Sequence, residues 1–310
     1  MLANFFDKTK PINSIVLSFI FFSFYTIYRF QPEASTFTDF TSFEILTHLI
    51  CSAFFLVICG LVFIKNGVSN DNLHNSFLMI LLYGMFPNAF EINKTLGVAF
   101  LALLMYRNIS QLKTKGKTQI LLFDSGLIAG VSFLLFDWTI LFLGFIYIGL
   151  FFSKKINFRT VVSPILGLIT PCILYFTYCL FTNTTPDFYN RFEFLYSLDT
   201  SLYSSIAIKI PLIVVSIATG IAIVTTLPKV ISISNSYRFQ YLLLLIMLGT
   251  GLILIVISPK KNGSEFLYIF IPIAVILGKF INILPQKKLK EIFLIGLTLF
   301  SIISLWHQPG

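Results

Sequence analysis

Long runs of hydrophobic residues, separated by short polar segments, make up almost the whole chain. Most of these runs approach the roughly 20 residues that an α-helix needs to cross the hydrocarbon core of a bilayer. The pattern predicts an all-α fold: a polytopic transmembrane helix bundle of about 9–11 membrane segments, without a separate soluble domain. The predicted segments are residues 11–28, 45–64, 76–90, 95–106, 120–136, 138–152, 160–181, 206–227, 241–258, 266–283 and 291–306.

Two places leave the number of crossings open. Segments 76–90 and 95–106 are short, and they either cross separately or form one re-entrant hairpin, with the flanking loops on the same side in both cases. Pro87-Asn88 interrupts the first segment near its end, and irregular backbone at membrane depth needs cover from protein or from a water-filled cavity. The second place is the tight hairpin at Asp137. We expect residues 1–310 to form a single integral membrane domain.

The basic residues predict how the protein is oriented. Arg29, Lys94, Arg191, Lys260 and Lys261 fall in loops on one predicted side, whereas 15 of the 22 Lys and Arg residues fall in loops on the other. Cytoplasmic loops retain Lys and Arg, so we place the N-terminus in the cytoplasm. The first apolar run is too long for a signal-peptide core and lacks a small-residue cleavage site, so we expect it to remain as the first span.

The composition agrees with a lipid environment. Of the 310 residues, 56% are hydrophobic and only 11% are charged, whereas soluble domains carry about 25% charged residues. The net charge of +9 does not indicate nucleic-acid binding, because the basic residues form no basic face or nucleic-acid motif. The cysteines lie inside apolar runs without CxxC spacing or a nearby His, so we expect no metal site and no cofactor; they are Cys51, Cys59, Cys172 and Cys179.

Acidic residues gather on the side opposite to the basic ones. Asp and Glu contribute little to orientation, so this bias reflects either ordinary solvated loop charge or a polar site that faces outward. Nine of the 13 acids fall in predicted outer loops: Glu33, Asp39, Glu44, Glu91, Asp137, Asp187, Glu193, Asp199 and Glu265.

Asp124 is the unusual acid, because it lies inside a predicted span near the cytoplasmic end. A carboxylate within a span is costly and suggests a function. Proton or ion coupling is one interpretation; the others are a brace between helices, with Arg107 or Lys117 as its partner, and simple interfacial charge. Gly126 and Gly130, one helical turn apart, share a helix face and would allow a neighbouring helix to approach closely.

The outer loops carry candidates for chemistry on a phosphate. Arg191, Lys260 and Lys261 are the candidate phosphate-binding residues, and the two lysines precede a Gly-Ser turn whose backbone donors would help. The alternative for the lysines is a loop whose side chains reach toward water. Asp39 and Glu44 lie in the first outer loop, where a carboxylate would act as general base on an acceptor hydroxyl.

This arrangement is similar to that of membrane glycosyltransferases that use a sugar linked to polyprenyl phosphate and carry an acid in the first outer loop. The similarity is architectural, and no short motif supports it. It implies a catalytic base at Asp39 or Glu44, and cations at Arg191, Lys260 and Lys261 that stabilise charge on the leaving phosphate.

A second resemblance covers nearly the whole chain. The opening Leu2–Asn13, Phe123–Leu127, Asn157–Arg159 followed by Gly167 and Pro171, and Gly263–Leu267 resemble an uncharacterised family of polytopic inner-membrane proteins from flavobacteria and related Bacteroidota. The chain departs from this pattern at Thr160, where an acid is expected. The resemblance implies a multi-pass protein of the bacterial inner membrane and brings no established activity.

Three functions remain open. The first is a non-enzymatic subunit or scaffold of a cell-envelope assembly, with other envelope membrane proteins and the lipid bilayer as partners. The second is an outer-face glycosyltransferase or polymerase with a polyprenyl-phosphate lipid as partner. The third is a transporter or flippase that uses Asp124. Motifs of soluble hydrolases, nucleotide-binding proteins and zinc proteases do not occur in the sequence.

Overall fold

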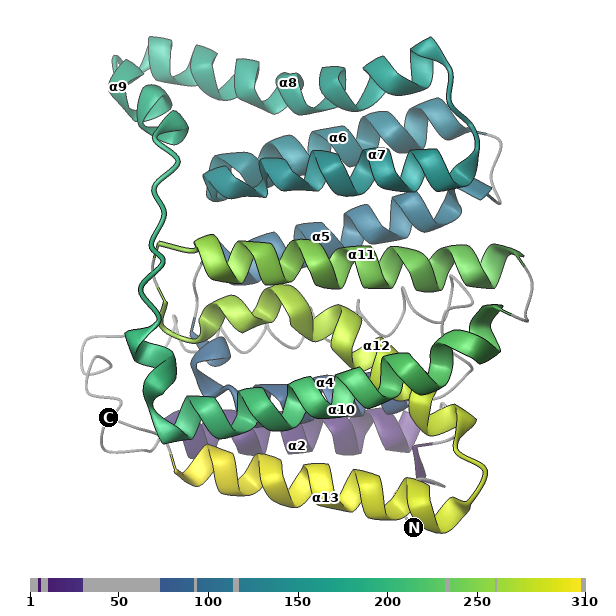
Figure 1. The fold of residues 1–310 in the computed structure, drawn as a ribbon. Helices are drawn as coiled ribbons and strands as arrows, with labels where there is room; N and C mark the ends of the chain where they lie inside the picture. Colours follow the sequence, from purple (N-terminus) through teal and green to yellow (C-terminus); the bar gives the residue numbers. More distant parts are fainter. Residues whose placement is uncertain are drawn as a thin grey trace. The chain divides into compact units, whose positions relative to one another are not determined.

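A computed structural model describes residues 5–6, 11–29, 73–91, 94–113, 117–231, 235–259 and 261–307. All regular elements in these ranges are helices (Figure 1). Seven of them are long and apolar enough to cross a membrane, which confirms the prediction of an all-α, multi-pass bundle. They are Ile12–Arg29, Thr118–Leu135, Phe158–Phe181, Ile206–Val230, Tyr237–Ile257, Ser264–Ile283 and Lys287–Trp306.

The chain divides into two compact units, each built from segments that are far apart in the sequence. Unit 1 comprises Met1–Ile92, Asp199–Ser232 and Lys261–Gly310. Unit 2 comprises Asn93–Leu198 and Ile233–Lys260. The predicted segments 76–90 and 95–106 correspond to helices of different units, and the predicted segment 45–64 lies outside the described residues.

Unit 1 is organised around two helices that are almost enclosed by protein. The helix α4 has 11 of its 12 residues buried, and 83% of the apolar stretch that contains α12 is buried. At about 1.5 Å per residue, α4 is too short to cross a bilayer by itself. The described elements of unit 1 are α2 (Pro11–Arg29), α4 (His74–Met85), η2 (Pro87–Phe90), η6 (Ser201–Ser204), α10 (Ile206–Ile231), η7 (Ser264–Phe266), α12 (Leu267–Ile283) and α13 (Lys287–Trp306).

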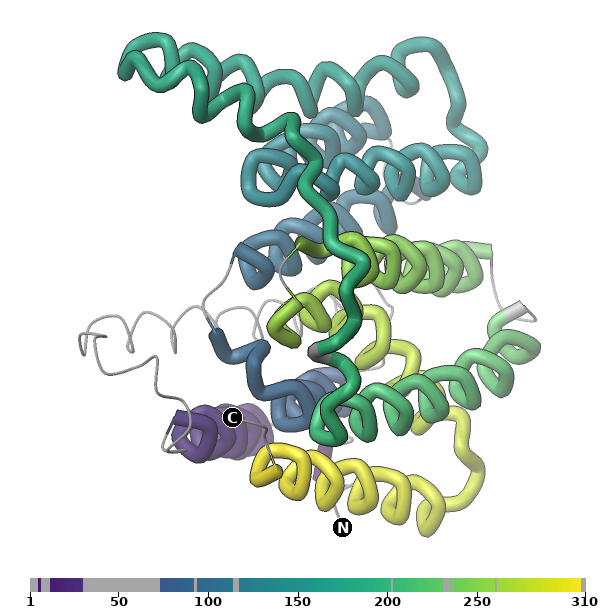
Figure 2. The backbone as a smooth tube through the Cα atoms, turned by 60° about the vertical axis from the view of Figure 1, so that its left-hand side comes forward, coloured from purple at the N-terminus to yellow at the C-terminus, as the bar shows by residue number. Residues whose placement is uncertain are grey.

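Polar and aromatic contacts hold α4 in place. The hydroxyls of Ser301 and Ser304 on α13 donate to the carbonyl oxygens of Leu81 (2.9 Å) and Met85 (3.0 Å) on α4. A Cβ at Gly84 would overlap the Ser301 hydroxyl, so the glycine allows this close approach. Figure 2 shows α2 and α13, from opposite ends of the sequence, side by side in this unit.

Unit 2 is built on glycine-mediated packing of α6 against α8 (Figure 1). A Cβ at Gly126 or Gly130 of α6 would overlap the carbonyl oxygens of Pro164 or Leu168, and one at Gly167 of α8 would overlap that of Phe123. The described elements of unit 2 are α5 (Lys94–Ser110), η3 (Gln111–Lys113), α6 (Thr118–Leu135), η4 (Asp137–Leu141), α7 (Phe142–Ser153), α8 (Phe158–Phe181), α9 (Thr185–Tyr189), η5 (Asn190–Phe192) and α11 (Asn235–Ile257).

Thr160, where the family pattern led us to expect an acid, caps the start of α8. Its Oγ1 accepts a hydrogen bond from the backbone N–H of Asn157 at 2.8 Å. A Glu at the third helical position makes the same bond in a capping box. Thr160 therefore replaces the acid in its local structural role.

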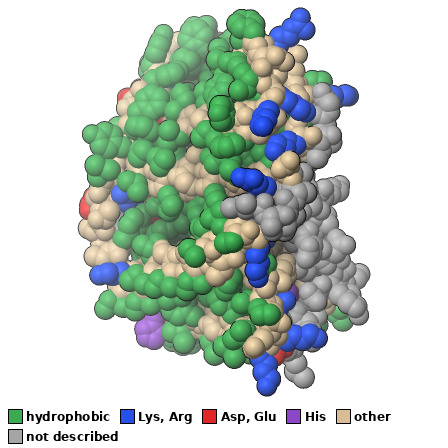
Figure 3. All heavy atoms as spheres, turned by 45° about the vertical axis from the view of Figure 1, so that its right-hand side comes forward, with side chains coloured by type: hydrophobic (Ala, Val, Ile, Leu, Met, Phe, Trp, Pro, Cys, Tyr) green, Lys and Arg blue, Asp and Glu red, His purple; other side chains and the backbone are tan. Residues whose placement is uncertain are grey.

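The outer surfaces of the long helices are apolar. Only six of the 24 residues of α8 are buried, and large hydrophobic side chains such as Leu174 and Phe181 are exposed on it. Hydrophobic side chains also cover most of the described surface on the face drawn in Figure 3. Such surfaces suit contact with lipid.

Candidate functional site

The structure does not bring the predicted phosphate-binding residues together within one unit. Arg191 belongs to η5 of unit 2, and Lys261 belongs to unit 1. Lys260 and the predicted bases Asp39 and Glu44 lie outside the described residues. The described contacts of Arg191 therefore belong to unit 2, and those of Lys261 belong to unit 1.

Arg191 lies at an aromatic end of unit 2. Its guanidinium is 5.9 Å from the centre of the Tyr175 ring, within the range of a cation–π contact. Phe188 of α9 packs on Phe176 of α8 with ring centres 4.9 Å apart, and the Trp138 indole N–H donates to the Leu195 carbonyl at 3.0 Å. Tyr and Trp favour the membrane–water boundary, so this end of unit 2 suits anchoring there.

Asp124 lies on α6 with its side chain exposed at the surface of the structure. Among the described residues, its carboxylate makes no ion pair with Arg107 or Lys117. On the same helix, Gly126 and Gly130 face α8. The geometry therefore assigns the glycines to packing and leaves Asp124 outside that contact.

The densest group of polar contacts occurs in unit 1, where η2, η6 and the loop before α12 meet. We call it the loop cluster: Asn88, Glu91, Asp199, Ser201, Tyr203, Lys261, Asn262, Gly263, Ser264 and Glu265. The predicted topology puts this end of unit 1 on the outer face. Sequence reasoning singled out Lys261 and the Gly-Ser turn but missed Asn88, Glu91 and Tyr203 as their partners.

Asn262 joins the two loops of this cluster. Its side-chain amide donates to Glu91 Oε2 at 2.9 Å. Its backbone carbonyl oxygen accepts a hydrogen bond from the side-chain amide of Asn88 at 2.5 Å. Its Oδ1 accepts from the Ser264 hydroxyl at 2.7 Å. These bonds fix the loop before α12 against η2.

Glu265 is the buried acid of the loop cluster, with only 1% of its surface exposed. One carboxylate oxygen accepts from the Tyr203 hydroxyl, and the other accepts from the backbone N–H of Gly263 at 2.9 Å. Gly263 has φ of +93°, a left-handed conformation that favours glycine. Burial and the bond to Glu265 raise the pKa of Tyr203, so Tyr203 remains a donor well above neutral pH.

Lys261 is buried in the same cluster, with 6% of its surface exposed. No described hydrogen-bond acceptor reaches its Nζ. The ammonium lies 5.8 Å from the centre of the Tyr203 ring, at the long end of the cation–π range. Burying an ammonium group without hydrogen-bond acceptors costs free energy. Lys261 is therefore a candidate ligand-binding residue.

Asp199 is the charged neighbour of Lys261. The backbone N–H of Ser201 donates to it at 2.9 Å and the Ser201 hydroxyl at 3.1 Å. These two bonds, with a smaller effect of the Lys261 charge, lower the pKa of Asp199. The carboxylate is exposed to solvent, and its two hydrogen bonds to Ser201 stabilise the local turn of the chain.

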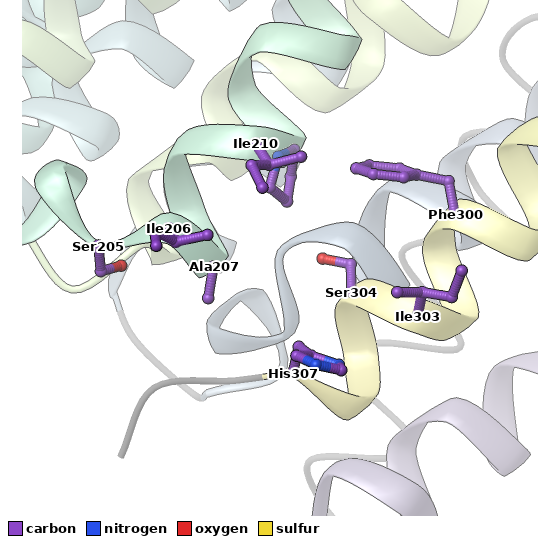
Figure 4. Close-up of a pocket in the computed structure, with 9 residues that line it drawn as sticks. Ser205, Ile206, Ala207, Ile210, Phe300, Ile303, Ser304 and His307 are labelled. Atoms are coloured by element: carbon purple, nitrogen blue, oxygen red, sulfur yellow. The ribbon is translucent and has the colours of Figure 1, made fainter.

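An apolar pocket of about 470 Å³ lies between the start of α10 and the end of α13 in unit 1 (Figure 4). Polar atoms lie at one end of it: the Ser205 hydroxyl, which has no described hydrogen-bond partner, and the side chains of Ser304 and His307. The sequence offered no sign of this pocket, because it depends on how two distant helices pair. The lining residues are Ser205, Ile206, Ala207, Ile210, Pro211, Phe300, Ile303, Ser304 and His307.

The described residues contain no group of three or more His, Cys, Asp or Glu side chains arranged to hold a metal ion. The features that they offer suit an amphipathic ligand: an apolar cavity with a polar rim and, in the loop before α12, a buried ammonium. Each of these belongs to unit 1.

Comparison with known proteins gives a family but no activity. No curated protein and no solved structure matches the chain. Residues 1–307 match the family of unknown function DUF6427. This all-α chain, whose described residues include seven helices able to span a membrane, is matched over almost its whole length and thus belongs to the DUF6427 family.

Proposed function

We propose that the protein is a lipid-binding, non-enzymatic subunit or scaffold of the bacterial cell envelope, embedded in the inner membrane. Its outward-facing end would hold one chain of an amphipathic lipid in the pocket between α10 and α13. The observation that carries this proposal is the pocket itself, which combines apolar walls with a polar rim at one end.

The size of the pocket fits a lipid chain. A volume of 470 Å³ falls within the range of about 300–1,000 Å³ that ligand pockets commonly measure. The walls come from Ile206, Ile210 and Ile303, and Phe300 closes one side (Figure 4). A cavity of this size and apolar lining suits a single lipid chain.

The position of the pocket also fits a membrane lipid. Both α10 and α13 are long and apolar enough to span a bilayer, and Ile206 and Ile303 are largely exposed beside the pocket. Ser205 and His307 lie at the ends of these helices, where headgroups meet water in a membrane. A lipid could therefore enter sideways from the bilayer and keep its headgroup at the boundary.

The acids of the loop cluster favour binding over group transfer. Glu265 accepts bonds from Tyr203 and Gly263, and Glu91 accepts one from Asn262. Carboxylates that hold the backbone of a loop are poorly suited to act as general bases, which must be free to take a proton from a substrate. The described acids of the loop cluster therefore suit a structural role in a receptor better than a role as catalytic bases.

Native mass spectrometry of the purified full chain tests this proposal. The wild type should retain one lipid per chain after exchange into a mild detergent. Ile210→Trp fills the pocket and should release that lipid. Ile217→Trp is the matched control, because Ile217 lies on the same helix, is similarly exposed and does not line the pocket.

Equal lipid retention by the wild type and Ile210→Trp would contradict the proposal. A wild type that carries no lipid would contradict it as well. Loss of lipid from Ile217→Trp to the same extent would show that any bulky side chain on α10 disturbs the bilayer contact, and would remove the argument for the pocket.

A further inference from the structure

Lys261 is a buried cation whose N–H donors have no described hydrogen-bond acceptor. Its side chain is 94% removed from solvent, since 6% is exposed, and no described acceptor lies within reach of Nζ. An ammonium carries three donors and no acceptor. The Tyr203 ring, 5.8 Å away, offers it only a weak contact, so an acceptor supplied by a ligand would complete the site.

The segment Asp199–Ile206 links Lys261 to the pocket. Tyr203 carries the ring beside the ammonium, and Ser205, two residues later, lines the pocket at its polar end. Two residues of chain span at most about 7 Å. The Tyr203 ring beside the buried ammonium and the unpartnered Ser205 hydroxyl are therefore carried by the same short piece of backbone in unit 1.

The charges near Lys261 leave it able to bind an anion. Asp199 is exposed, and its two oxygens accept bonds from Ser201. Glu265 is engaged by Tyr203 and Gly263. Neither acid makes an ion pair with Lys261 among the described residues, so the lysine donors remain available to a ligand.

We infer that the lipid held by unit 1 is a phosphate-headed lipid, with its chain in the pocket and its phosphate accepting hydrogen bonds from Lys261 and Ser205. This inference rests on the lipid-binding function proposed above and adds the chemistry of the headgroup. A phosphate offers several acceptor oxygens and a negative charge, which suits one ammonium and one hydroxyl. A neutral headgroup would bring no negative charge to the buried ammonium.

Binding of a chain-matched pair of probes tests the headgroup. Farnesyl phosphate and farnesol share a fifteen-carbon chain and differ in the phosphate. The full-length wild type in detergent should bind the phosphate at least about tenfold more tightly, as expected for charge-assisted hydrogen bonds. Lys261→Met keeps an apolar stem of similar length and should reduce that preference to about twofold or less, while farnesol binding is unchanged.

Lys288→Gln is the matched control for loss of one positive charge. Lys288 is exposed at the start of α13, the opposite end of that helix from the pocket. This variant should retain the wild-type preference. Lysophosphatidate, with a single acyl chain, reports whether the site requires a prenyl chain or accepts any lipid phosphate; the inference predicts that it also binds more tightly than monoacylglycerol.

The outcomes separate the two proposals. Equal binding of farnesyl phosphate and farnesol by the wild type would overturn the phosphate assignment and leave the lipid-binding function standing. Binding of neither probe, nor of the acyl pair, would overturn both. A preference that persists in Lys261→Met would overturn the role of Lys261, and the wild-type comparison remains decisive if that variant does not fold.

Discussion

The two units use similar apolar helices in different ways. Unit 1 surrounds α4 and α12 with other helices, so that 83% of the α12 stretch is buried. Unit 2 joins α6 to α8 through glycines and leaves only six of the 24 residues of α8 buried. Hydropathy therefore does not distinguish a helix that faces lipid from one that faces protein.

The difference between the units follows from their small and polar residues. In unit 2, glycines bring the backbones of α6 and α8 close together, and van der Waals packing supplies the stability. In unit 1, hydroxyls and the loop cluster tie helix ends together through hydrogen bonds. The pocket and the buried Lys261 lie in the unit where polar contacts organise the helix ends.

The largest effect is expected in unit 2 from Gly126→Leu. The new side chain would overlap the Pro164 carbonyl, which is backbone and cannot move aside cheaply. We expect a loss of about 3 kcal/mol in the free energy of unfolding, measured by thermal unfolding in detergent. Gly144→Leu is the control, since a Cβ at Gly144 meets nothing within 4 Å; equal losses would contradict glycine-mediated packing.

In unit 1 the loop cluster should be sensitive to Tyr203→Phe. This change removes the donor to Glu265 and leaves one oxygen of a buried carboxylate without that bond. The expected loss of stability is about 1.5–3 kcal/mol, the range for hydrogen bonds to charged groups. Tyr196→Phe, at an exposed tyrosine, should cost almost nothing.

The pH dependence of the stability difference between the wild type and Tyr203→Phe gives a further check. The pKa of Tyr203 is raised, chiefly by burial and then by Glu265, so the contribution of its neutral hydroxyl is fully present below the ordinary tyrosine value of about 10. The gap between wild type and Tyr203→Phe should stay constant from about pH 6 to 9 and shrink only as the pH rises further. A gap that already closes at about pH 8 would contradict the burial of this hydroxyl.

The smallest effect is expected at the start of α8. Thr160→Ala removes the acceptor for the Asn157 N–H and should cost about 1 kcal/mol. Thr160→Glu should restore the cap, because a Glu at this position makes the same bond. Melting temperatures of the two variants measure this, and a Glu variant no better than the Ala variant would exclude the capping role.

The fold was largely predictable from the sequence, because run length and apolarity report directly on membrane spans. The predicted segment 206–227 corresponds to α10, and 160–181 to α8. The boundary between the units was not predictable, since it separates α4 from α5, which follow each other closely in the sequence.

The candidate site was less predictable. Lys261 was recognised by its charge, but its burial depends on Tyr203 and on loops that meet only in the folded chain. The pocket pairs Ser205 and His307 from distant segments whose sequences show nothing unusual. Asp39 and Glu44 lie outside the described residues, so a role as catalytic bases stays a prediction.

The most direct test of the central claim is to ask what touches the pocket in a membrane. A photoreactive benzophenone amino acid at Ala207, which lines the pocket, should on illumination in native membranes form a defined lipid adduct, identified by peptide mass spectrometry. The same amino acid at Gly220 of α10, where a Cβ meets nothing within 4 Å, should give only a heterogeneous mixture of bulk lipids. A defined adduct at Ala207 alone is the predicted result. The same bulk mixture at both positions would contradict a lipid-binding pocket.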